Sequence, residues 1–219
     1  MVSVIGDVLS TAEVAALREA AADLPFQDGR ASAGRFAAGV KNNEQAENSP
    51  ALEAILEKVK AALDGNPLFR SVARPRRYTR MLVSRYEPGM EYGSHVDDAI
   101  MGGARTDLSF TVFLSDPETY DGGGLIMQEA AEDRRFRVDA GDMVLYPTGQ
   151  LHRVEPITRG TRLAVVGWVQ SWVRDPARRE VLHDLDTATQ AVFEAGGKTQ
   201  HFDRLLKAKT NLYRMWAEG

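Results

Sequence analysis

The middle of the chain, from Arg77 to Asp175, alternates short apolar runs with turns that contain glycine or proline, and no helical spacing interrupts it. The runs are rich in β-branched and aromatic residues, which favour strands. Consecutive strands without crossover helices pair antiparallel, so the block is predicted to form a barrel or a two-sheet jelly roll. The predicted strands are residues 78–86, 107–114, 125–128, 134–138, 143–146 and 162–170.

Helical patterns flank this block on both sides. A capping box at Ser10–Glu13 and a start at Ser49-Pro50 each precede apolar residues at helical spacing. Two more such stretches follow Pro176 and are separated by Gly196-Gly197. We therefore predict an α+β fold with a mainly β core, a double-stranded β-helix (jelly roll) buttressed by N-terminal helices and followed by a C-terminal helical pair.

These patterns divide the chain into three parts. Residues 1–76 form the N-terminal helical buttress, 77–175 the β core and 176–219 the C-terminal helical extension. Within the buttress, residues 28–48 are predicted to be a loop with one strand near 35–40, because glycines recur and no helical period is present.

Composition excludes several classes of protein. A chain of 219 residues with 43% hydrophobic and 26% charged residues can bury a sizeable core and is not disordered. The net charge of −4 argues against a general nucleic-acid binder, and the absence of cysteine excludes disulfides and thiolate metal sites. No run approaches the roughly 18 apolar residues of a membrane span, and no secretory signal pattern opens the chain. We expect a cytoplasmic protein with no membrane association.

His95 and Asp97 form a His-x-Asp sequence. Residues two apart on a strand point to the same face, so this imidazole and this carboxylate can bind one cation. They would supply two of the three ligands of the two-histidine, one-carboxylate triad of non-haem Fe(II) oxygenases. Alone, the pair is equally compatible with an ordinary His and Asp at a strand end.

Two downstream residues strengthen the metal interpretation. His152 follows the turn at 147–150, and Arg162 comes ten positions later, at the start of the apolar strand 163–169. His152 would complete the triad and leave three iron positions open, while the planar guanidinium of Arg162 suits a carboxylate. A dicarboxylate cosubstrate such as 2-oxoglutarate needs both features: open metal positions for its keto-acid end and a cation for its far end.

The order of these motifs resembles a known family. The chain is similar to the prolyl 4-hydroxylase-like branch of the Fe(II)/2-oxoglutarate dioxygenases, and more narrowly to the bacterial PKHD-type hydroxylases. The resemblance is densest from residue 77 to 175 and continues into the C-terminal helices. It rests on Tyr86, His95-Val96-Asp97, Arg105 to Ser109, Phe113 to Asp116, Asp121 to Leu125, Gly141-Asp142, Leu145 to Pro147, His152 to Val154, Gly160 to Arg162 and Trp168 to Asp175.

The resemblance implies a function and a site. Fe(II) would be held by His95, Asp97 and His152, with 2-oxoglutarate chelating the iron through its keto-acid end. Arg162 would pair with the distal carboxylate of 2-oxoglutarate, and Tyr86 would donate a hydrogen bond to it. The reaction would consume O2, release succinate and CO2, and hydroxylate a substrate C–H bond, with ascorbate open as a reductant.

Alternatives stay open at this stage. Arg162 could instead be a structural partner of Asp107 or Asp142, and Tyr86 could be packing on a strand. The same triad could serve a cupin-like metal enzyme of other chemistry, which would not need Arg162. A non-catalytic sensor of iron, oxygen or 2-oxoglutarate could bind all three without turnover.

Other features carry weaker expectations. The substrate is not identified and could be a small molecule or a peptidyl group, and the C-terminal helices permit a homodimer. Residues 98–106 could be a mobile lid or a plain strand connection. His183 and His201 are expected to be surface or satisfied histidines. A solvated strand face is expected for the basic run of Arg70, Arg74, Arg76, Arg77 and Arg80, with a role toward an anionic substrate or an acidic partner as the alternative.

Overall fold

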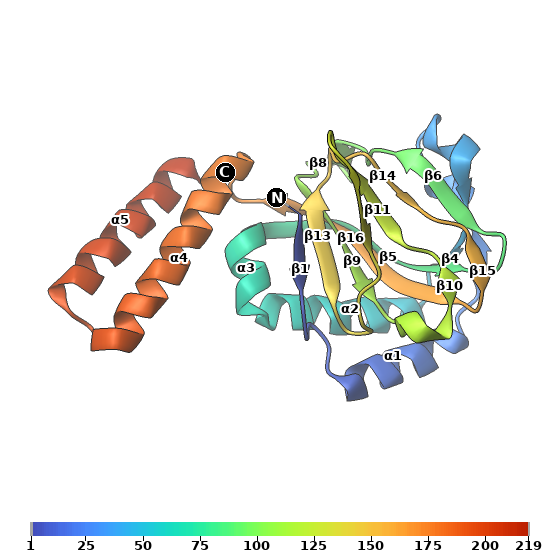
Figure 1. Ribbon diagram of the computed structural model, residues 1–219, viewed down its shortest axis with the longest axis horizontal. Coiled ribbons are helices and arrows are strands. Elements are labelled where there is room, and N and C mark those ends of the chain that lie inside the picture. The colour runs from blue at the N-terminus through green and yellow to red at the C-terminus, as the bar shows by residue number, and fades with distance from the viewer. Residues whose placement is uncertain (1, 219) are drawn as a thin grey trace.

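Two antiparallel sheets stacked face to face form the body of the molecule, in a computed structural model that describes residues 2–218 (Figure 1). The larger sheet has seven strands, in the order β1 (Ser3–Ile5), β13 (Met143–Pro147), β9 (Leu108–Phe113), β16 (Arg162–Ser171), β5 (Pro75–Tyr86), β4 (Glu44–Ala46) and β2 (Phe26–Asp28). The smaller has five, in the order β12 (Asp133–Phe136), β11 (Leu125–Gln128), β14 (His152–Val154), β6 (Glu91–His95) and β3 (Lys41–Asn42). This is the predicted double-stranded β-helix with its mainly β core.

Short elements complete the body. Two-stranded ribbons pair β7 (Ile100–Met101) with β8 (Ala104–Arg105) and β10 (Asp121–Gly122) with β15 (Ile157–Arg159). The helices are α1 (Thr11–Ala22), α2 (Pro50–Gly65), α3 (Pro67–Ala73), α4 (Pro176–Gly196) and α5 (Gln200–Trp216), with 3-10 turns η1 (Gly29–Ser32), η2 (Ala37–Val40) and η3 (Pro117–Thr119). No helix of the described chain is both long and apolar enough to cross a membrane.

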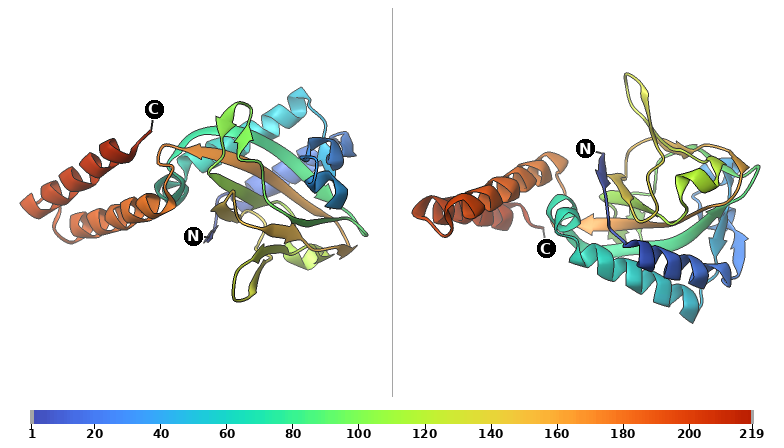
Figure 2. Two further views of the ribbon diagram at one scale, coloured as in Figure 1. Left: turned by 90° about the horizontal axis from the view of Figure 1, so that it is seen from above. Right: turned by 60° about the horizontal axis from the view of Figure 1, so that its bottom comes forward.

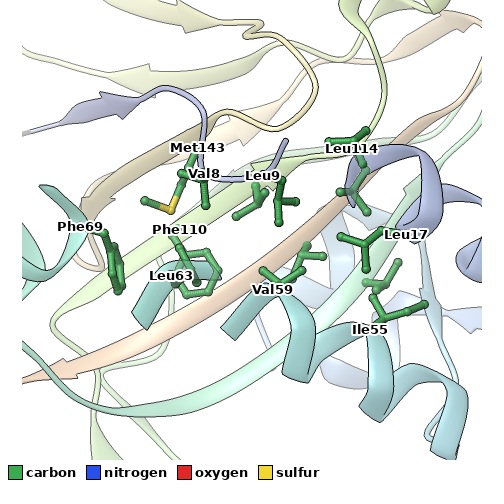
Figure 3. Close-up of a cluster of buried hydrophobic side chains, with 14 of the residues drawn as sticks. Val8, Leu9, Leu17, Ile55, Val59, Leu63, Phe69, Phe110, Leu114 and Met143 are labelled. Carbon is green, nitrogen blue, oxygen red and sulfur yellow. The ribbon is translucent and has the colours of Figure 1, made fainter. Parts of the chain in front are cut away.

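The larger sheet is covered by helices on its outer face (Figure 3). Strand β9 is buried on both faces. Its residues Phe110 and Val112 pack with Leu63 and Val59 of α2 in the outer core, while Phe113 packs in the second core, between the sheets. The alternation of a strand therefore gives β9 one face for the helices and one for the interior of the sandwich.

Several predicted elements are observed. The capping box at Ser10 and Glu13 is present at the start of α1, and Ser49 caps α2 with Pro50 in the first turn. The Gly196-Gly197 break falls between α4 and α5.

Two local predictions are wrong. Residues 37–40 form a 3-10 turn and not a strand, and the strands of this region, β3 and β4, begin only at Lys41. The arginine-rich segment is also not one strand face, because Asn66 and Pro67 start the short helix α3, which carries Arg70 and ends at Arg74.

The C-terminal helical pair projects away from the β body; α4 packs on α3, and Glu218, just after α5, forms a salt bridge with Arg105 of β8 (Figures 1 and 2). Asp186 of α4 joins the two parts, since it forms salt bridges with Arg74 and with Lys209 of α5, the latter at 3.0 Å. The Oγ of Ser71 donates to the same carboxylate and lies 2.9 Å from Nδ1 of His183. His183 is thus a satisfied histidine, as expected, and His201 is exposed.

The outer core supplies a stability test. Leu63, on α2, is fully buried against the larger sheet. Leu63→Ala should therefore lower the free energy of unfolding by about 2–5 kcal/mol, because apolar burial is lost and a cavity remains. Leu68, on α3, is 42% exposed, and Leu68→Ala should change the same free energy by less than about 0.5 kcal/mol. Denaturant unfolding measures both, and equal losses would contradict this assignment of the core.

Candidate active site

The predicted site residues lie in one pocket between the two sheets. His95, Asp97, His152, Arg162 and Tyr86 all line it, around a cavity of about 110 Å³. The three candidate metal ligands come from the smaller sheet and the loop after it, whereas Arg162 and Tyr86 come from the larger sheet. The sandwich is what brings the two groups together.

Strands β5 and β16 give the pocket two different ends. They pair antiparallel, with Arg162 opposite Tyr86 and Trp168 opposite Arg80. Alternate residues of β5 from Arg80 to Tyr86 line the pocket, as strand periodicity requires. One end, named here the deep end, carries buried Arg162 and Tyr86, and the other, the mouth, carries exposed Arg80.

The three candidate metal ligands converge at the neighbouring ends of two strands. His95 ends β6 and lies directly opposite His152, which begins β14. Asp97 follows the end of β6, so it is not on a strand, contrary to the prediction. Its carboxylate still reaches the histidines, at 3.8 Å from Nε2 of His95 and 3.9 Å from Nε2 of His152. One ligand atom from each residue lies within 4.8 Å of the others, so the three could hold a metal ion.

Backbone contacts set the orientation of both imidazoles. Nδ1 of His95 lies 2.8 Å from the carbonyl of Gly93, and Nδ1 of His152 lies 2.9 Å from the carbonyl of Gln150. A carbonyl only accepts, so each Nδ1 carries a proton, and each ring turns its Nε2 toward Asp97. Burial, with the adjacent His152, lowers the pKa of His95 to about 4, which keeps this ring neutral near pH 7.

Asp97 and His95 are also fixed by neighbouring side chains. The Oγ of Ser109, on β9, donates to Oδ2 of Asp97 at 2.7 Å. The ring of Tyr92 stacks on His95 with centroids 3.5 Å apart and planes 15° from parallel. These contacts fix the direction of side chains that a metal ion would otherwise have to order.

Arg162 at the deep end is a buried cation with free hydrogen-bonding capacity. It is 1% exposed, and its Nε is buried without a hydrogen-bond partner within residues 2–218. The guanidinium carbon lies 5.4 Å from the ring centroid of Tyr86 and 4.9 Å from that of Phe113. Gly123, at φ 62°, packs against it so closely that a Cβ there would lie 3.1 Å from Cδ of Arg162.

The structural alternative for Arg162 is not observed. Asp107 instead pairs with Arg105 at 2.7 Å, and Asp142 accepts the backbone N–H of Asp7 at 2.9 Å. Tyr86 is also buried, and burial raises its pKa to about 12, so its hydroxyl stays protonated and can donate. The deep end therefore holds an uncompensated positive charge and a hydroxyl beside it.

Several pocket residues escape sequence reasoning. Lys41, Asn43 and Gln45 line the pocket at a spacing of two, within the segment predicted to be mostly loop. All five residues of the sequence Lys-Asn-Asn-Glu-Gln are polar, so no alternation of apolar and polar residues marks a strand here. Trp168 also lines the pocket, on the strand already predicted.

Residues 98–106, the candidate lid, form the β7–β8 ribbon at the edge of the pocket. Its turn has positive φ at Gly102 and Gly103, the geometry that favours glycine. Met101 lines the pocket and Ile100 is 62% exposed. The side chain of Arg105 ties the ribbon to Asp107. A lid role stays a prediction.

The chain matches two family models. Residues 81–170 match the 2OG-Fe(II) oxygenase superfamily, and residues 176–218 match the PKHD-type hydroxylase C-terminal domain. A PKHD-type hydroxylase of Synechococcus elongatus is 47% identical over the whole of both chains. One of Maricaulis maris is 48% identical over 96% of each. The chain belongs to the PKHD-type hydroxylase family. It is an oxygenase that uses Fe(II), 2-oxoglutarate and O2, as the sequence predicts.

Solved structures show the same fold as this PKHD-type hydroxylase. HygX from Streptomyces hygroscopicus, with nickel and 2-oxoglutarate bound, aligns with a TM-score of 0.59 at 16% identity, covering 78% of this chain and 84% of HygX. A Pseudomonas putida prolyl-4-hydroxylase aligns with a TM-score of 0.51 at 23% identity, covering 78% of this chain and 92% of that one. At these identities the likeness concerns the fold alone.

The contact behind Asp97 gives a test of this site. Ser109→Ala removes the donor to Oδ2 of Asp97 and should weaken metal binding by about 10- to 100-fold, because the carboxylate loses its fixed direction. Ser84→Ala is a matched control, since Ser84 lines the same pocket but bonds only a backbone carbonyl, at 3.5 Å. Titration with Mn(II) measures both, and unchanged affinity in Ser109→Ala would show that Ser109 does not orient the ligand.

Proposed function

We propose that His95, Asp97 and His152 hold the Fe(II) of this PKHD-type hydroxylase. The observation that carries the proposal is the convergence of one ligand atom each from two histidines and one carboxylate, all within 4.8 Å, in a buried pocket. Two neutral imidazoles and one carboxylate are the donor set of non-haem Fe(II) sites with open positions. The residues present therefore fit the ion that the family requires.

We propose that the deep end binds the distal carboxylate of 2-oxoglutarate. Arg162 has an orphaned buried Nε and no acidic neighbour that uses its charge, so a carboxylate would satisfy both. The protonated hydroxyl of Tyr86, opposite Arg162 across the strand pair, would donate to the same group. A cupin-like enzyme of other chemistry would have no use for this buried guanidinium.

In this mechanism the protein supplies position, charge and the exclusion of water. The bound iron, with 2-oxoglutarate and O2, supplies the oxidising chemistry that hydroxylates a C–H bond and leaves succinate and CO2. Arg162 and Tyr86 fix the far end of the cosubstrate, so that its keto acid faces the triad. Tyr92 and Ser109 hold the ligands, and Trp168 and Met101 shield the mouth side of the pocket from water.

Finer expectations stay proposals. The substrate is a small molecule or a peptidyl group, and ascorbate is a reductant that keeps the iron ferrous, on the family resemblance alone. A cytoplasmic location, a homodimer through the C-terminal helices and the absence of nucleic-acid partners rest on composition and on the exposed apolar residues of those helices. The division of the chain into three parts, at residues 76 and 175, is also a proposal and rests on the sequence patterns.

The metal proposal predicts one ion per chain. His95→Ala and His152→Ala should each abolish stoichiometric binding, because two ligands leave the ion exposed and poorly held. His183→Ala is the control, since this histidine bonds Ser71 far from the pocket. Metal analysis after gel filtration measures the content, and full loading of His152→Ala would contradict the ligand set.

The cosubstrate proposal predicts a separate effect at Arg162. Truncating one partner of a buried charge pair costs about 2–5 kcal/mol, so Arg162→Ala should weaken 2-oxoglutarate binding at least about tenfold while Mn(II) affinity is kept. Arg162→Lys should restore part of the loss, because the charge remains and the planar fork is lost. Calorimetric titration of Mn(II)-loaded protein decides this. Unchanged cosubstrate affinity in Arg162→Ala would return Arg162 to a structural role.

A further inference from the structure

Besides Arg162, the pocket is lined by two further cations, at its mouth. Lys41 of β3 is 7% exposed and lines the pocket together with Arg80 of β5. Lys41 approaches from the smaller sheet and Arg80 from the larger one, so the two face each other across the mouth. The sequence separates them by a helix-containing segment, and only the sandwich brings them together.

Lys41 is buried without a carboxylate of its own. Its Nζ donates to Oγ of Ser32 at 2.9 Å and lies 5.0 Å from the ring centroid of Tyr92. The two carboxylates that attract it electrostatically are engaged elsewhere: Asp28 pairs with Arg30, and Asp97 faces the histidines. Burying an ammonium without a counter-charge is costly, and an anion in the pocket would offset that cost.

The electrostatics of Lys41 point the same way. Burial, followed by repulsion from Arg80, lowers the pKa of Lys41 to about 8. The ammonium is still mostly protonated at pH 7, but it loses its proton far more easily than an exposed lysine does. Two like charges that repel each other are both stabilised when a single anion lies between them. Asp98, the acidic group at this edge, is exposed to solvent.

The backbone of Arg80 is too far from that of Arg162 for the two arginines to bind the same carboxylate. Arg80 and Arg162 lie six positions apart along the paired strands, about 20 Å at roughly 3.3 Å per residue. 2-Oxoglutarate, a five-carbon chain, has about the length of two extended residues at roughly 3.5 Å each. If Arg162 takes its distal carboxylate, Lys41 and Arg80 are left for another molecule.

Tyr92 connects this cation to the metal position. One face of its ring lies under Nζ of Lys41 and the ring stacks on His95 at 3.5 Å. An anionic group held by Lys41 would therefore lie next to the triad. This is where the molecule to be hydroxylated must lie.

We infer that Lys41 and Arg80 recognise a carboxylate on the substrate, and that the hydroxylated substrate is an organic acid or an acidic side chain. The inference rests on the proposed placement of 2-oxoglutarate at Arg162. In this inference Lys41 and Arg80 determine which substrate binds and how it is oriented. The triad and the deep end bind the metal and the cosubstrate. The position of Lys41 and Arg80 sets which C–H bond of the substrate faces the iron.

The test uses the full chain loaded with Mn(II) and saturating 2-oxoglutarate. Two matched probe pairs differ only in charge: hexanoate with hexanamide, and acetyl-Gly-Glu-Gly-amide with acetyl-Gly-Gln-Gly-amide. Paramagnetic relaxation of the probe protons by Mn(II) reports binding close to the metal without any turnover. The acidic member of at least one pair should bind about tenfold more tightly than its amide, the factor expected for one charge-assisted hydrogen bond. The pair that discriminates tells whether the substrate is a free acid or a peptide.

Variants assign the effect to the two cations. Lys41→Met and Arg80→Gln should each reduce the affinity for the acid about tenfold and leave that for the amide unchanged. Arg80 is exposed, so Arg80→Gln should fold even if the buried Lys41→Met does not. Lys60→Met, at an exposed lysine of α2 paired with Asp64, is the control and should behave as the wild type.

Three results would overturn the inference. One is equal binding of acid and amide, or no binding, in both pairs by the wild type. Another is a preference for the acid over its amide that is kept in both Lys41→Met and Arg80→Gln. The third is loss of acid binding when 2-oxoglutarate is added, because the anion site would then belong to the cosubstrate. A failure of 2-oxoglutarate to bind the metal-loaded protein would instead refute the proposed function itself, so the two failures are distinguishable.

Discussion

The antiparallel pairing of β5 with β16 is the interaction on which the rest of the structure depends. These are the two longest strands, of 12 and 10 residues, and they lie side by side in the larger sheet. Their outer face packs on α2 through residues such as Val83 and Val165, and their inner face lines the pocket. Because the pairing fixes Arg162 opposite Tyr86 and Trp168 opposite Arg80, it also fixes the polarity of the pocket. A slip of β16 by one residue would turn both Arg162 and Trp168 to the helix face.

The metal position depends on a different sheet. His95 and His152 are neighbours across β6 and β14, and their rings are aimed by backbone carbonyls that any sequence would provide. Asp97 is aimed by Ser109, which belongs to β9 of the larger sheet. The triad is thus assembled across the sandwich, so loss of packing between the sheets would loosen the site even with all three ligands intact.

Much of the fold could be predicted from the sequence, because long strands and helices carry their own periodicity. The capping box at Ser10 and the apolar spacing of α2 are local signals, and the structure has both helices. The strands of residues 26–46 are only two or three residues long and owe their form to pairing: β3 pairs with β6, β4 with β5, and β2 with β4. Such tertiary pairing leaves a weak trace in the sequence, which is why the sequence predicts a loop at Lys41.

The residues of the site could be predicted from ordered motifs, but their arrangement within the pocket could not. His95, Asp97, His152, Arg162 and Tyr86 could be singled out from the ordered motifs, and one pocket holds them all. The distinction between a deep end and a mouth could not be foreseen, because it needs the register of two strands more than 70 residues apart. The burial of Lys41 also depends on Ser32 and Tyr92, which no local pattern connects.

In the proposed arrangement, one pocket holds the metal at its middle, the cosubstrate at the deep end and the substrate at the mouth. A crystal structure of the protein with Mn(II) and 2-oxoglutarate tests it most directly. The account predicts a single anomalous peak bounded by His95, Asp97 and His152, with the distal carboxylate of 2-oxoglutarate on Arg162. A metal peak elsewhere, or that carboxylate on Lys41 and Arg80, would contradict it.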